Sequence, residues 1–445
     1  MNLAQNRRFS SYCYKIACLW VYLGQNIGMT NIKLPELLAP AGTLDAFKTA
    51  ILYGADAIYA GLPGFSMRAR AKIDVEGVKQ GIELAHAAGK KVYLAFNLFA
   101  HDFEYDNLPR VAEIINYLSP DALIVSDAGI MMWVRENFPN MPIHISTQAN
   151  ICSAKTVKFW QNAGAKLCVL AREVSHNEFK RIRAECPDVG LEIFVHGAMC
   201  MSYSGRCLLS NFVTGRPANR GACAQLCRWK YDVILRERES GVEMPIDEDE
   251  RGAYIMNSKD LCLMPRLAEV ITAQPDSLKI EGRNRSEYYV GSVVHAYRCA
   301  MDAYARNPEN FDPTPYMDML NKLETRGYTT AFFDGPVTAD AHNYETTRST
   351  SDYHAAGVIT NVTEEHIEFE LRNETRVGDE ITFVLPMCDT MPTVKLAKII
   401  NAKNGEEIEK MAAGMGNTII IPKQWLGDAP YDKFVPYVVA YKGKR

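Results

Sequence analysis

Eight short strand patterns, each followed by a helical pattern, are the feature that most constrains how this chain can fold. Apolar, β-branched runs recur from residue 36 onward, and the segments between them carry apolar residues at helical spacing. The expected strands are Glu36–Pro40, Ala57–Gly61, Lys91–Asn97, Ala122–Ser126, Pro142–Ser146, Leu167–Ala171, Leu191–Gly197 and Asp276–Gly282. Such a series predicts an α/β fold, a (β/α)8 TIM-like barrel, with an open doubly wound sheet as the alternative. No G-x-G-x-x-G or Walker motif supports a nucleotide-binding version of the open sheet.

The barrel prediction gathers polar side chains at one end of the strands. Residues alternate between the lumen and the helix layer, so Glu192, Phe194 and His196 are expected to share the lumen face of strand seven. Lys279 and Glu281 are expected to do the same in strand eight. Active sites of such barrels lie at the carboxyl ends of the strands. The polar residues expected there are Asn97, Ser126, Asp127, Ser146, Gln148, Arg172, Glu173, His196 and Glu281. A hydrogen bond inside the lumen would explain any single one, and it is their convergence that favours a site.

Four cysteines fall in the long connection between strands seven and eight. They are Cys200, Cys207, Cys223 and Cys227, and the candidates are a metal site, an iron–sulfur cluster, a disulfide pair or a redox thiol. Gaps of six, fifteen and three residues do not match the two tight pairs of a zinc ribbon. A four-iron four-sulfur (4Fe-4S) cluster accepts ligands from a long, glycine-rich loop, so we expect one here. Ordinary buried cysteines are the plain alternative.

The same connection is basic and aromatic. From Arg206 to Arg236 it has six basic residues against one acid, Asp232, and Tyr203, Phe212, Trp229 and Tyr231 are interleaved with or border them. Such a loop can contact phosphates and stack bases, or it can be a solvated loop with its aromatics in the core. The net charge of the chain is −4, so nucleic acid would have to bind a local patch.

Two motifs give the chain a family resemblance. HGAMCMSYSGRCLLS at residues 196–210 and SLKIEGR at residues 277–283 resemble the hallmarks of the collagenase-like peptidase family U-32. ELLAPAG and GADAIYAG resemble that family's N-terminal half, so the resemblance runs from residue 34 to the C-terminus. Several members are oxygen-independent hydroxylation proteins for RNA or quinone precursors with an iron–sulfur cluster. The two-domain length is most similar to members that hydroxylate wobble uridine of tRNA with prephenate.

The resemblance implies a cytoplasmic enzyme for oxygen-independent 5-hydroxylation of wobble uridine. It would bind the tRNA anticodon loop, use prephenate as a small anionic donor, and receive its 4Fe-4S cluster from the iron–sulfur assembly machinery. The expected catalytic residues are His196, Lys279, Glu281 and Arg283. The expected substrate-binding residues are Arg172, Arg206, Arg228 and Trp229. The expected cluster ligands are Cys200, Cys207, Cys223 and Cys227, and Cys262 can replace one of them, because some relatives take a ligand from this later part of the loop.

Other functions stay open at this point. A peptidase needs an activated nucleophile or a metal-bound water. The motifs G-x-S-x-G and H-E-x-x-H are absent, which leaves Cys200 with His196 as a possible pair. Hydroxylation of rRNA, and an iron–sulfur redox protein that binds RNA without modifying it, are the remaining alternatives.

Composition divides the chain into four parts. Residues 1–33 are expected to be a disordered leader or extended start, with a secretory signal as the alternative because Arg7, Arg8 and Lys15 precede a short apolar run. Residues 34–337 are the expected barrel domain with the cysteine-rich loop 197–275, residues 338–353 a polar linker, and residues 354–445 a small β-barrel of alternating strands. No segment is apolar enough to cross a bilayer, and twelve cysteines without paired spacings favour a reducing compartment.

Overall fold

The computed structural model describes residues 32–65, 73–200, 202–203, 206–216, 218, 223–228, 234–236, 243–245, 258–337, 339–341, 343, 349–387 and 390–444. The expected leader therefore lies almost wholly outside the described residues. Among the helices within these ranges, none combines the length and the apolar character that a membrane span requires.

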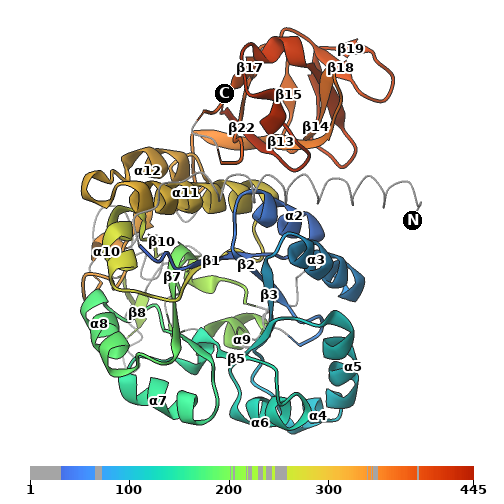
Figure 1. Cartoon of the computed structure of the whole chain (residues 1–445). Helices are drawn as coiled ribbons and strands as arrows, with labels where there is room; N and C mark the ends of the chain where they lie inside the picture. The colour runs from blue at the N-terminus through green and yellow to red at the C-terminus, as the bar shows by residue number, and fades with distance from the viewer. Residues whose placement is uncertain are drawn as a thin grey trace.

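Eight parallel strands form the closed barrel that the sequence predicts (Figure 1). Each pairs with its neighbour in sequence order, and the eighth strand pairs with both the first and the seventh, which closes the ring. The strands are β1 (Glu36–Pro40), β2 (Ala57–Gly61), β3 (Lys91–Phe96), β4 (Ala122–Val125), β5 (Ile143–Ile145), β6 (Leu167–Val169), β7 (Gly190–Ala198) and β11 (Ser277–Ile280). They are almost entirely buried, as expected for a parallel sheet covered by helices outside and side chains inside.

Helices surround the barrel, and several begin at a polar cap. The helices are α2 (Leu44–Leu52), α3 (Val75–Ala87), α4 (Asp102–Tyr105), α5 (Leu108–Leu118), α6 (Ala128–Asn137), α7 (Ala154–Asn162), α8 (His176–Glu185), α10 (Leu267–Thr272), α11 (Glu287–Arg306) and α12 (Thr314–Leu320). The side chains of Thr43, Asp74, Asp127, Ser153, Ser175 and Ser286 accept hydrogen bonds from the first turns of the helices they precede. These caps satisfy backbone N–H groups that have no partner within a helix, and so fix where each βα turn ends.

The cysteine-rich connection starts and finishes at one place on β7. Its described elements are α9 (Leu209–Thr214), the antiparallel pair β8 (Ile234–Arg236) and β9 (Glu243–Pro245), and β10 (Asp260–Cys262). Strand β10 runs antiparallel to β7, with Asp260 opposite Ala198, and β12 (Tyr328–Thr329) pairs with the other edge of β10. Asp260 is buried and forms an ion pair with Arg326, whose Nε also donates to the carbonyl of Ser258 at 2.9 Å. The return of the connection to the barrel is therefore firmly anchored.

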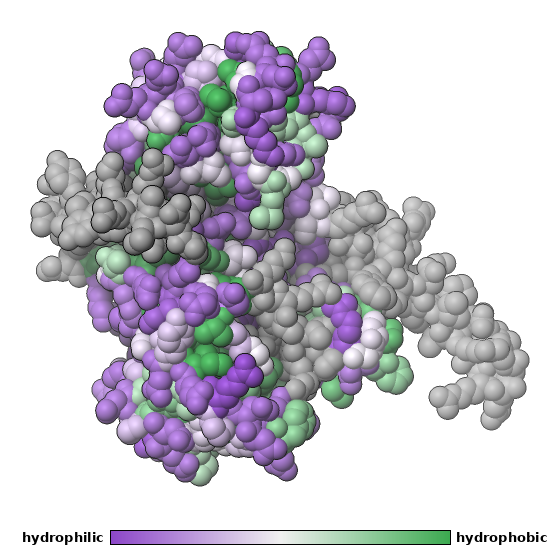
Figure 2. All heavy atoms as spheres, turned by 90° about the vertical axis from the view of Figure 1, so that its right-hand side faces the viewer, coloured by the Kyte–Doolittle hydropathy of each residue, from purple (hydrophilic) through white to green (hydrophobic). Residues whose placement is uncertain are grey.

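The second domain is a curled antiparallel sheet, which confirms the prediction of a small all-β domain. The order of the main sheet is β17-β16-β22-β13-β14-β21-β18-β19, and β15 pairs with β20. The strands are β13 (Tyr353–Val362), β14 (His366–Leu371), β15 (Thr375–Arg376), β16 (Glu380–Phe383), β17 (Thr393–Lys395), β18 (Ile399–Asn401), β19 (Glu407–Ile408), β20 (Lys410–Met411), β21 (Thr418–Pro422) and β22 (Val439–Gly443). On the face shown in Figure 2 this domain is mainly hydrophilic.

The second domain packs against α2 and α11, on the outside of the helix ring (Figure 1). Tyr53, at the end of α2, is fully buried there, and its hydroxyl donates to the carbonyl of Val384 at 2.5 Å and accepts from the amide of Val439 at 3.0 Å. Lys48 donates to the hydroxyl of Tyr437 at 2.7 Å. The buried apolar side chains of the two domains form one continuous core.

A candidate active site at the barrel mouth

Three of the predicted residues meet at the carboxyl end of the barrel. The guanidinium of Arg172, just after β6, lies 3.7 Å from the carboxylate of Glu281, which follows β11. Arg283 lies beside them with its guanidinium 5.7 Å from the ring centre of Tyr59, and the Tyr59 hydroxyl is 3.4 Å from Glu281. Glu281 and Arg283 are 9% and 7% exposed, so these charges interact in a largely dehydrated setting. Two guanidinium groups around one carboxylate leave a positive site at the mouth, which suits an anionic ligand.

Lys279 lies one layer deeper in the lumen. Its ammonium group is 2.6 Å from a carboxylate oxygen of Glu192 and 4.4 Å from the ring centre of Tyr59. Both charged side chains are almost completely buried, so each charge offsets the cost of taking the other out of water. Lys279 therefore supports the mouth from below, and the predicted lumen parity of Glu192, Lys279 and Glu281 is what the structure has.

The prediction that His196 faces the lumen is wrong. Phe194 pairs with Lys279 and His196 with Ile280, so Val195 is an extra residue on β7 and the parity of the strand reverses there. The His196 ring instead lies 5.4 to 6.0 Å from the rings of Tyr289, Tyr297 and Tyr328, in the layer outside the barrel. Burial lowers the pKa of His196 to about 3, and its Nδ1 has no hydrogen-bond partner among the described residues. A neutral, enclosed imidazole of this kind is a packing residue, not a general base for the mouth.

A second polar group completes the rim. Asn97 donates to the hydroxyl of Ser146 at 3.3 Å, and Ser126 donates to the carbonyl of Asn97 at 3.0 Å. Gln148 is also buried, and its side-chain oxygen has no partner within the described part of the chain. These amide and hydroxyl groups offer neutral hydrogen bonds opposite the charged cluster. Asp127, in contrast, caps α6 by accepting a hydrogen bond from the amide of Ile130. Glu173, the last of the predicted rim residues, is partly buried, and this burial raises its pKa.

The remaining predicted substrate-binding residues belong to the cysteine-rich connection. Arg206 is exposed, and its guanidinium lies 5.1 Å from the ring centre of Phe99, a residue that follows β3 at the same end of the barrel. The backbone of Arg228 lies in a short 3-10 turn, but its side chain and the whole of Trp229 are outside the described residues.

Of the four loop cysteines, Cys200 and Cys223 are exposed and Cys207 and Cys227 are half-buried. Accessible thiols are suitable donors for a soft metal centre or cluster. Within the described residues, no three Cys, His, Asp or Glu side chains converge on one point. Cys262 is 1% exposed, with its sulfur 3.9 Å from the hydroxyl of Tyr297, and burial raises its pKa to about 11.

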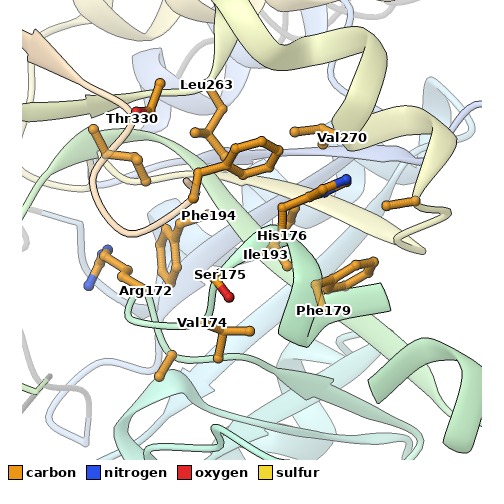
Figure 3. Close-up of a pocket in the computed structure, with 14 residues that line it drawn as sticks. Arg172, Val174, Ser175, His176, Phe179, Ile193, Phe194, Leu263, Val270 and Thr330 are labelled. Atoms are coloured by element: carbon orange, nitrogen blue, oxygen red, sulfur yellow. The ribbon is translucent and has the colours of Figure 1, made fainter. Parts of the chain in front are cut away.

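A small pocket opens beside the mouth, between α8 and α10 (Figure 3). Arg172 and Phe194 line this pocket, and Arg172 also pairs with Glu281 at the mouth. The Arg172 guanidinium stacks 3.8 Å from the ring centre of Phe194. The other walls are largely apolar, with Ser175, His176 and Thr330 as polar exceptions. The charged groups converge at the mouth, and the pocket is a lateral extension of it.

Tyr59 and Phe194 also lie at the mouth. Phe194 was predicted to face the lumen but had no predicted role in the site, and Tyr59 was not predicted at all. Tyr59 stands in the apolar run of strand two, where an aromatic residue is explained by core packing. Its lumen parity was the available signal, because strand residues of one parity point into the barrel.

Comparisons with known proteins place the chain among a family of related sequences. The sequence model of peptidase family U32 matches residues 42–343. The tRNA hydroxylation protein P of Escherichia coli is 39% identical over 87% of this chain and 93% of its own length. The collagenase of Porphyromonas gingivalis is 31% identical over 80% of this chain and 88% of its own. The 23S rRNA 5-hydroxycytidine C2501 synthase of Escherichia coli is 35% identical over 60% of this chain and 39% of its own.

Proposed function

The chain belongs to peptidase family U32, and we propose that it is a tRNA-modifying enzyme that hydroxylates C5 of wobble uridine without molecular oxygen. The observation that carries the proposal is the buried cluster of Arg172, Glu281 and Arg283 at the barrel mouth. The names of the RNA-hydroxylating relatives supply the reaction class.

Arg172 and Arg283 would bind the carboxylates of an anionic hydroxyl donor, for which we propose prephenate. Each guanidinium group can donate two parallel hydrogen bonds to one carboxylate, and burial of the guanidinium strengthens the attraction. In the balanced reaction, the C5–H of uridine becomes C5–OH, and the donor that loses its hydroxyl takes up the hydrogen and two electrons. Glu281 holds Arg172 in place, and Lys279 below it keeps the lumen charges matched.

We also propose that the cysteine-rich connection binds a 4Fe-4S cluster through Cys200, Cys207, Cys223 and Cys227, which must draw together when it is loaded. Such a cluster supplies electron transfer or a Lewis-acidic iron. The test is the iron and sulfide content of anaerobically purified protein. Cys200→Ser should lose both, whereas Cys299→Ser on α11 should keep them. Parallel Cys227→Ser and Cys262→Ser variants decide which thiol is the fourth ligand. Stoichiometric zinc without sulfide would contradict the proposal.

The function is tested in a deletion strain by mass spectrometry of tRNA nucleosides, with redundant pathways removed. Deletion should lower the mass of the wobble nucleoside and its derivatives by one oxygen atom. The wild-type gene should restore it, and Arg283→Ala should not. Arg181→Ala, on the exposed side of α8, is the matched control and should restore it. Unchanged nucleosides after deletion would refute the proposal.

Proteolysis is the alternative raised by the family name and by the collagenase relative. The described mouth residues do not include a cysteine or serine paired with a histidine, since His196 lies outside the barrel. Cleavage of gelatin by pure protein, lost in Cys200→Ser, would favour the peptidase instead. As part of the same proposal, the enzyme acts in the cytoplasm, where tRNA and the iron–sulfur assembly machinery are found.

A further inference from the structure

The short helix α9 displays apolar side chains that nothing in the described structure covers. Leu208, Phe212 and Val213 are 71%, 88% and 53% exposed. Leu208 and Phe212 are four residues apart and therefore lie on the same side of this helical turn. A cluster of large apolar side chains left in water is unfavourable, and such clusters usually mark binding surfaces.

Although α9 is only six residues long, hydrogen bonds hold it in place. The buried hydroxyl of Ser210 donates to the carbonyl of Arg216 at 2.6 Å and accepts from the amide of Ala224 at 2.8 Å. Gly215, in the left-handed region with φ of 65°, ends the helix. These contacts tie α9 to the segment that contains Cys223. Phe212 is therefore displayed by a fixed support, which lowers the entropy cost of stacking another group against it.

The charge of the sequence that contains α9 indicates what this surface binds. The sequence from Arg206 to Arg228 contains four arginines and no aspartate or glutamate. A surface that combines aromatic and apolar side chains with unbalanced positive charge matches single-stranded nucleic acid, whose bases stack while its phosphates pair with arginine. A protein partner would require only the apolar part of this surface, so the charge favours RNA.

The position of α9 connects it to the mouth. Arg206, two residues before Leu208, contacts Phe99 at the carboxyl end of the barrel. In the view of Figure 1, α9 overlaps the area that the helices surround. We propose that Phe212, supported by Leu208, is the stacking platform for an unpaired nucleotide that neighbours the modified base, with Arg206 and Arg216 contacting its phosphates. This inference rests on the proposed RNA-modifying function.

The test measures binding of full-length, anaerobically purified protein to a fluorescent RNA hairpin with a uridine-containing loop. Phe212→Ala should weaken binding roughly 5- to 150-fold, the range for loss of one base–aromatic stack, and Phe212→Trp should preserve it. The matched control is Phe159→Ala, because Phe159 is 62% exposed on α7, in the outer helix layer, and should leave binding unchanged.

The salt dependence separates stacking from charge. Phe212→Ala should leave the slope of log Kd against log salt unchanged, whereas Arg216→Ala should reduce it by about one. Equal affinity of wild type and Phe212→Ala for the hairpin, or equal affinity of wild type for hairpin and blunt duplex, would overturn the platform while leaving the proposed function standing. Failure of the wild-type protein to bind any tRNA-derived hairpin would instead count against the proposed function itself.

Discussion

At the scale of single residues, buried charges on the inner face of the barrel support the mouth. Glu192, Lys279 and Glu281 all lie on the lumen side, and the Lys279 ammonium pairs with the Glu192 carboxylate. After Phe194, the extra residue Val195 reverses the parity of β7, so His196 lies outside the barrel.

The lumen ion pair should be costly to break on one side only. Lys279→Met leaves the Glu192 carboxylate buried without its partner, and we expect a loss of about 3–5 kcal/mol in the free energy of unfolding. The double variant Lys279→Met, Glu192→Leu removes both charges and should recover at least half of that loss. Urea denaturation measures both. A double variant as unstable as the single one would show that volume, not charge, determines the cost.

Glu36 makes stability depend on pH. Burial raises its pKa to about 7, although the Tyr93 hydroxyl, 2.8 Å away, opposes the shift. The folded state therefore binds this proton more tightly than the unfolded state. The stabilisation is complete below about pH 4.5 and is lost as the pH rises through 7. Glu36→Gln should match wild type near pH 4.5 and be more stable by on the order of 3 kcal/mol at pH 8. Urea unfolding at both pH values tests this, and a difference independent of pH would contradict it.

At the scale of elements, the eight barrel strands were predicted within one or two residues at each end. Strands β10 and β12 were missed, because each is very short and forms only by pairing with a neighbouring strand, β10 with β7 and β12 with β10. The residues of the mouth could be predicted only in part, since Tyr59 stands in an apolar run and only its lumen parity distinguishes it from a core aromatic. The loop cysteines were obvious in the sequence, whereas their relative positions depend on loop conformation.

The turn between β1 and α2 should not tolerate a side chain at Gly42. A Cβ there would lie 1.9 Å from the carbonyl oxygen of Arg283, far inside contact distance. Gly42→Ala must push the two loops apart and displace Arg283 from the mouth. We expect a loss of about 1–3 kcal/mol in stability and loss of tRNA hydroxylation. Gly443→Ala, with nothing within 4 Å of its Cβ, is the control for thermal denaturation. Normal activity of Gly42→Ala would show that Arg283 need not be placed so exactly.

At the scale of the whole molecule, the two domains share hydrogen bonds that composition could not reveal. Tyr53→Phe leaves the Val384 carbonyl and the Val439 amide buried without their partner, which should cost about 1–3 kcal/mol. Tyr117→Phe, on the exposed side of α5, is the control and should change stability much less than Tyr53→Phe does. Calorimetry compares the two variants, and equal small effects would mean that water reaches the Tyr53 site.

The division at the polar linker stays a prediction. A fragment of residues 34–337 should fold and retain the far-ultraviolet circular dichroism of a (β/α)8 barrel, because the barrel closes without the second domain. It should be less stable than the full chain, since Tyr53 and its apolar neighbours on α2 and α11 lose their cover. An insoluble fragment from a soluble full chain would show that the two domains form one folding unit.

The antiparallel pairing of β10 with β7 makes the cysteine-rich connection an insertion that could be replaced without changing the barrel. Because Asp260 lies opposite Ala198, the excursion leaves and re-enters the scaffold at neighbouring backbone positions. A two-residue hairpin turn can therefore bridge the same gap without altering the register of any barrel strand. The barrel and the cysteine-rich connection can then change independently. One barrel can therefore carry inserted segments of different length and chemistry at this single attachment point.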